Sequence, residues 1–123
     1  MIYTEQNDIG IISFNKSILN QLINVSVMPW SKPGKLKLVS KHFEVLEKGI
    51  LVEIHISLAF GESTTEVVNH ILDYLSDEIV NSLECQVYDI IVSIDTMFTS
   101  KGATAERNFR YSYREREFGR ENY

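Results

Sequence analysis

The sequence predicts an α+β domain, a two-layer sandwich of one mostly antiparallel sheet with two helices on one face. Two amphipathic helical patterns alternate with short apolar runs of period two, in the order β-α-β-β-α-β. Each helix must cover its apolar stripe and each strand offers an apolar face, so one sheet with both helices on the same side is the simplest solution. Right-handed crossovers favour a split βαβ arrangement of the strands.

The N-terminal part of the chain is expected to hold the first strand and the first helix. Residues 9–14 are short, apolar and β-branched, which is typical of a strand. Asn15 is a suitable N-cap, and apolar residues then recur at helical spacing up to about Met28. Pro29 and the sequence Ser31-Lys32-Pro33-Gly34 should end this helix in a loop.

The clearest pattern is an alternation of apolar and polar residues that begins at Leu36 and is strongest after Gly49. The apolar positions of its second half are Ile50, Val52, Ile54, Ile56, Leu58 and Phe60. Lys48-Gly49 separates the two halves. A glycine-containing connection between two alternating runs predicts a β-hairpin.

A second helix should begin at Ser63, because Ser63 and Glu66 have the spacing of a capping box. Its apolar stripe consists of Val67, Val68, Ile71, Leu72, Leu75, Ile79 and Leu83. Residues 87–98 alternate again and form the last expected strand. Because apolar periodicity ends at Gly102, we divide the chain into a domain over residues 1–102 and a C-terminal tail over residues 103–123.

The composition is that of one globular domain. The chain has 123 residues, of which 44% are hydrophobic and 24% charged, and its net charge is −5. A single cysteine, Cys85, leaves no partner for an internal disulfide or a cysteine-based zinc site. No apolar run reaches the roughly 18 residues of a membrane span, and the N-terminus has no pattern of a secretory signal. We therefore expect a cytoplasmic protein that meets a membrane only through a partner.

The stretch Gly10-Ile11-Ile12-Ser13-Phe14 and the strand that ends in Leu58-Ala59-Phe60-Gly61 resemble the bacterial alkaline shock protein family, also called envelope stress response proteins. Segments 50–61, 66–83 and 87–98 match the family's layout in order and spacing. The resemblance implies a non-enzymatic cytoplasmic scaffold that acts through protein–protein contacts linked to the cell envelope or to fatty-acid metabolism. Membrane-anchored proteins or fatty-acid metabolism enzymes would be its partners. The resemblance supplies no catalytic residue and no cofactor.

Few residues suggest catalysis. Glu53, His55 and Ser57 occupy alternate positions of one expected strand, whereas a catalytic triad converges from separate elements. His42 and Glu44 share a strand face, as do Glu53 and His55, but neither pair has further ligands at the spacing of a metal site. We therefore expect no enzymatic activity, no cofactor and no metal site.

The C-terminal tail is the most distinctive segment, because all five arginines of the chain lie in it among aromatic residues. Guanidinium groups stack on aromatic rings and bind carboxylates or phosphates. The tail is a solvated terminus, a docking segment for a protein partner or a second copy, or a contact for RNA or anionic lipid. Its candidate residues are Arg107, Phe109, Arg110, Tyr111, Tyr113, Arg114 and Arg116. An RNA-associated module that binds through this tail is the alternative function, although Glu53, Asp89 and Asp95 on the strands would repel phosphates.

The body of the domain offers two further candidate contacts for a partner. Trp30 either closes one end of the core or anchors a partner, a role in which tryptophan is enriched. Asp73, Asp77 and Glu84 lie on the polar side of the second helix. They form a negative stripe that the cationic tail could contact on its own chain or on a second copy.

Overall fold

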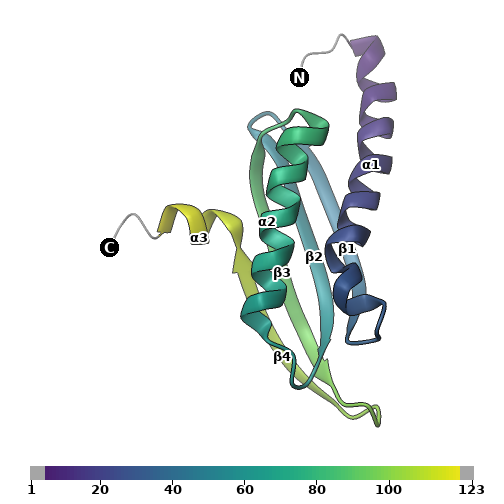
Figure 1. Ribbon diagram of the computed structural model, residues 1–123. Helices are drawn as coiled ribbons and strands as arrows, with labels where there is room; N and C mark the ends of the chain where they lie inside the picture. Colours follow the sequence, from purple (N-terminus) through teal and green to yellow (C-terminus); the bar gives the residue numbers. More distant parts are fainter. Residues whose placement is uncertain (1–4, 120–123) are drawn as a thin grey trace.

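The computed structural model describes the backbone of residues 5–119 and the side chains of residues 16–117. The elements, in chain order, are α1 (Glu5–Ser31), β1 (Leu36–Leu46), β2 (Gly49–Ala59), α2 (Thr64–Leu83), β3 (Val87–Phe98), β4 (Thr104–Ser112) and α3 (Tyr113–Gly119). The strands form one sheet in the order β1-β2-β3-β4 (Figure 1). The β1–β2 and β3–β4 pairs are antiparallel, and the β2–β3 pair is parallel.

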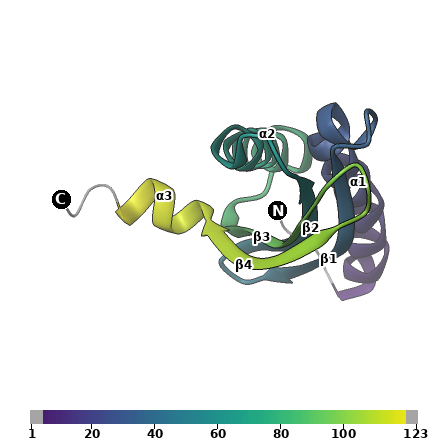
Figure 2. The same cartoon turned by 90° about the horizontal axis from the view of Figure 1, so that it is seen from below.

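Helices α1 and α2 run in opposite directions and pack on the same face of the sheet (Figures 1 and 2). Their apolar stripes share a single core, in which α1 lies beside α2 and β1, and α2 lies against β3. Every residue of the stripe expected for α2 is buried, and so are the helix-facing positions of β2, which are Ile50, Val52, Ile54, Ile56 and Leu58. The α+β class and the two helices on one face are confirmed. No helix in the described part of the chain is both long enough and apolar enough to cross a membrane.

The start of α2 also confirms its sequence pattern. Ser63 is the N-cap, and its hydroxyl accepts a hydrogen bond of 3.3 Å from the Glu66 amide. Phe60, by contrast, lies beyond the end of β2 and is 41% exposed, so it does not continue the apolar face as expected.

The strand expected at residues 9–14 was wrong, because this segment belongs to α1. A short β-branched apolar run fits either structure by its pattern alone. A strand needs a neighbouring strand for its hydrogen bonds, whereas a helix that has formed gains one bond with each added residue. The helix ends at Ser31, two residues beyond Pro29.

The tail expected after residue 102 was also wrong over its described part. Residues 104–112 form β4, which pairs with β3 in the same sheet, and α3 follows directly. β4 is an edge strand whose residues are mostly exposed, so it shows no apolar alternation. The last four residues, 120–123, lie outside the described part of the chain.

The strand connections are simpler than the expected split βαβ arrangement. β2 and β3 are direct neighbours and are joined by α2, which makes one βαβ unit with an antiparallel strand on either side. Asp95 has no partner in either ladder of β3, because the register shifts at this residue against both β2 and β4. This β-bulge redirects the side chains around Asp95.

Candidate functional site

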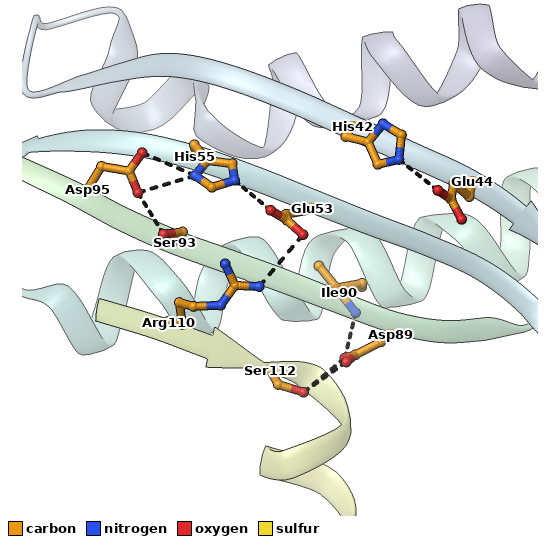
Figure 3. A network of polar contacts seen from close by, with 10 residues as sticks. All are labelled: His42, Glu44, Glu53, His55, Asp89, Ile90, Ser93, Asp95, Arg110 and Ser112. Carbon is orange, nitrogen blue, oxygen red and sulfur yellow. Dashed lines mark hydrogen bonds and ion pairs between the residues drawn. The ribbon is translucent and has the colours of Figure 1, made fainter. Parts of the chain in front are cut away.

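The sheet face opposite α1 and α2 carries a polar network centred on His55 (Figure 3). His55 Nε2 lies 2.6 Å from Glu53 Oε2, and His55 Nδ1 lies 3.1 Å from Asp95 Oδ2. Ser93 Oγ donates to Asp95 Oδ1 at 2.6 Å, and Arg110 Nη2 lies 3.6 Å from Glu53 Oε1. The network therefore joins β2, β3 and β4 across the sheet.

The two carboxylates favour a proton on the imidazole between them. The hydrogen bond to Glu53 raises the pKa of His55, burial opposes this, and the hydrogen bond to Asp95 raises it further. The hydrogen bond from His55 lowers the pKa of Glu53, and that from Ser93 lowers the pKa of Asp95. An imidazolium that donates from both nitrogens satisfies both carboxylates at once.

We call this network the clamp on His55, because Glu53 and Asp95 hold the imidazole from both sides. Both His55 nitrogens face carboxylates, so neither is available as a general base toward the hydroxyl of Ser57. Ser57 Oγ instead lies 2.6 Å from Thr96 Oγ1. Among the described residues, no group of three or more His, Cys, Asp or Glu side chains is placed to hold a metal ion.

Within the described residues, the arginines expected in the tail contact acidic or aromatic groups of their own chain. Arg116 Nη2 lies 2.7 Å from Asp73 Oδ1, and its Nη1 donates to Asn69 Oδ1 at 3.1 Å. The guanidinium of Arg114 lies 4.6 Å from the ring centroid of Tyr88. Of the residues predicted to contact a partner, the structure thus brings together one cation, Arg116, and one acid, Asp73.

The remaining candidate residues of the expected tail lie on β4 and α3. Arg107 lies over the ring of Phe60 at 5.5 Å, and Phe109 is 45% exposed. Tyr111 and Tyr113 pack against the hydrophobic core. Aromatic residues that we expected to meet a partner are thus partly used within the fold.

The helical face carries an apolar groove between α1 and α2. The groove has a volume of about 510 Å³ and is lined by Val25, Met28, Pro29, Lys32, Pro33, His70 and Tyr74. Trp30 is half-buried, packs against the core, and meets the His70 ring edge-on with centroids 5.1 Å apart. We call this surface the α1–α2 groove.

Helix α2, which forms one side of the α1–α2 groove, is acidic. α2 contains Glu66, Asp73, Asp77 and Glu78 but neither lysine nor arginine. Burial raises the pKa of Tyr74, and the nearby Glu78 carboxylate raises it further. Asp77 is exposed, whereas Glu84 caps the C-terminal end of the helix in a left-handed conformation.

The sequence showed Glu53 and His55 as neighbours on one strand face, and Asp95 only as a polar position of a different strand. The contact of Asp95 with His55 depends on the parallel register of β2 and β3 and on the bulge, neither of which has a local signal. Val25 and Met28 appeared as ordinary members of a helical stripe, and only the packing of α1 on α2 leaves them exposed.

Comparison with family models, with curated proteins and with solved structures finds no match to this chain. The geometry of the two surfaces is therefore the basis for a functional proposal.

Proposed function

We propose that this chain is a non-enzymatic, cytoplasmic protein-interaction domain and that the α1–α2 groove is its docking surface. The observation that carries the proposal is the exposure of apolar side chains in this groove. Val25 is 39% exposed and Met28 is 45% exposed, and both line one continuous surface with Tyr74. Isolated apolar residues are ordinary on protein surfaces, but a contiguous apolar patch marks an interaction site.

The residue types in the α1–α2 groove suit binding to a protein. Methionine adapts to the shape of a partner surface, and tryptophan and tyrosine are the side chains most often found as interaction hot spots. Tyr74 lines the groove, and Trp30 lies next to it, in contact with the ring of His70. The opposite sheet face is a weaker candidate because its charged groups already pair with one another.

RNA binding is the competing class. It has less support because Arg107 and Arg114 stack on aromatic rings and Arg116 pairs with Asp73. Arg116 would have to leave Asp73 before it could bind a phosphate, and stacking on rings restricts where Arg107 and Arg114 can reach. The experiment below therefore includes nuclease treatment as one arm.

Site-specific photocrosslinking in the cells that make this protein tests the proposal. A photoreactive amino acid in place of Met28 should give a discrete protein adduct that survives nuclease and is lost when Val25→Glu is added. Val39 is the matched control position, since it is 58% exposed but lies on β1, away from the groove. The proposal fails if position 28 gives no protein adduct, if position 39 gives the same one, or if nuclease removes it.

A further inference from the structure

We infer that the α1–α2 groove takes a cationic amphipathic helix of a partner protein. The apolar stripe of this helix would lie in the groove, with its lysine or arginine side chains against α2. The inference rests on the proposed function and names the class of partner for that same surface. Three observations support it, from the shape of the groove, its charge and a contact within the chain.

The shape of the groove suits the packing of a third helix between α1 and α2. Val25 and Met28 follow one another at turn spacing along α1, with Lys32 one turn further, just beyond its end, and His70 and Tyr74 follow one another along α2. Two antiparallel helices whose outward rows lie side by side leave a channel into which the ridge of another helix packs. Helix-in-groove binding uses such i, i+3 and i+4 anchor positions.

The charges around the groove select the sign of the partner. Glu66 and Asp77 lie one turn from His70 or Tyr74 along α2, and Glu78 follows Tyr74 by four residues. Across the described residues, none of these three carboxylates pairs with a lysine or arginine. The α1 side contributes a single cation, Lys32, at the end of the groove. Acidic side chains on α2 beside an apolar groove favour a partner helix that has cations next to its apolar stripe.

A contact within the chain shows the same chemistry on the acidic face of α2. Arg116, from the short helix α3, reaches Asp73 and Asn69 on α2, and its side chain is only 18% exposed. A cationic helical segment therefore already docks on this acidic helix. Glu66, Asp77 and Glu78 offer comparable positions beside the groove without such a partner.

Two synthetic peptides of roughly 18 residues, long enough to form a helix, test the inference. Both carry the same leucine stripe at helical spacing and no tryptophan, and their polar positions are all lysine in one and all glutamate in the other. Trp30 is the only tryptophan of the chain, so its emission reports docking next to His70. The lysine peptide should bind about tenfold more tightly than the glutamate peptide, with a smaller difference in high salt.

Charge-removing variants then locate the contact. The double variant Asp77→Asn with Glu78→Gln should weaken binding of the lysine peptide by roughly threefold to tenfold, the effect of losing two exposed ion pairs. Glu106→Gln is the matched control because Glu106 is an exposed acid on β4, away from the groove, and should change nothing. Met28→Glu should prevent binding of the glutamate peptide and leave only weak electrostatic binding of the lysine peptide.

The inference is overturned if the two peptides bind equally, if the glutamate peptide binds better, or if neither binds. It is also overturned if Glu106→Gln weakens binding as much as the double variant does. These failures are separable from failure of the proposed function. A protein adduct from position 28 that persists while both peptides fail to bind keeps the docking surface and removes the cationic helix as its occupant.

Discussion

Arg116 Nη2 lies 2.7 Å from Asp73 Oδ1, and this ion pair ties α3 to the middle of α2. Forty-three positions separate the two residues in the sequence. The Arg116 side chain is 18% exposed and that of Asp73 is 64% exposed, so the pair lies at the border of the protein surface. The cationic C-terminal segment thus finds an acid of α2 within its own chain, as an ordered helix rather than as a free tail.

A double-mutant cycle with Arg116→Gln and Asp73→Asn measures this pair. We expect a coupling energy of about 0.5–1 kcal/mol in urea unfolding, because Asp73 remains largely solvated. The single change at Arg116 should cost more than the change at Asp73, since Arg116 also donates to Asn69 and Glu117. A coupling energy of zero would mean that the contact contributes nothing to holding α3.

Removal of residues 103–123 should destabilise the whole domain, because β4 pairs with β3 and Tyr111 packs against the core. The loss uncovers the edge of β3, a strand whose centre is buried, and such an edge promotes aggregation. Circular dichroism melting and sedimentation would show a lower transition and aggregates. Removal of residues 113–123 alone should leave a cooperative transition, since β4 remains.

The parts of the fold that the sequence predicted well are those whose signal is local. The alternation around Ile54 and the stripe through Leu75 each place consecutive apolar side chains on one face, and the core buries both sets. Residues 9–14 and 104–112 failed for opposite reasons. The first is apolar but has no strand beside it, and the second forms a strand although its residues are mostly exposed.

The candidate sites depended on contacts between elements and were predicted only in fragments. The opposite charges of Arg116 and Asp73 suggested a contact, but the sequence left open whether it forms within one chain or between two. The contact of His55 with Asp95 needs a parallel register interrupted by a bulge. The α1–α2 groove exists because two stripes pack side by side and leave Met28 uncovered, which is a property of the packing rather than of either stripe.

Gly49 should tolerate no side chain. Its φ is +136°, and a Cβ atom there would lie 2.6 Å from the carbonyl oxygen of Gln86, a backbone atom that cannot move aside alone. Backbone strain alone costs about 1–3 kcal/mol. Because the close approach to Gln86 adds to this strain, Gly49→Ala should lower the free energy of unfolding by more than about 1 kcal/mol. Gly34→Ala is the control, because Gly34 also has a positive φ, of +77°, but open space around it. Equal costs at the two positions would show that the close approach to Gln86 is unimportant.

The clamp on His55 should make stability depend on pH in both directions. The pKa of His55 is raised from its ordinary 6.5, so its contribution is complete below that pH and is lost as the pH rises through the folded-state value. The pKa values of Glu53 and Asp95 are lowered from 4.5 and 3.8, so their contributions are present above those values and are lost as the pH falls through the folded-state ones. The clamp therefore stabilises the fold most in weakly acidic solution.

Urea unfolding of the wild type and of His55→Gln at about pH 5.5 and about pH 8.5 tests this dependence. The wild type should lose stability between the two conditions, and the variant should lose less, because glutamine cannot carry the proton that binds both carboxylates. His42→Gln is the matched control. His42 contacts Glu44 at 3.0 Å, and its side chain is 63% exposed, so solvent screens the pair. His42→Gln should therefore lose as much stability between the two pH values as the wild type does. Parallel pH profiles for the wild type and His55→Gln would show that a proton on His55 does not hold β2 to β3, and the network would then be a set of neutral hydrogen bonds.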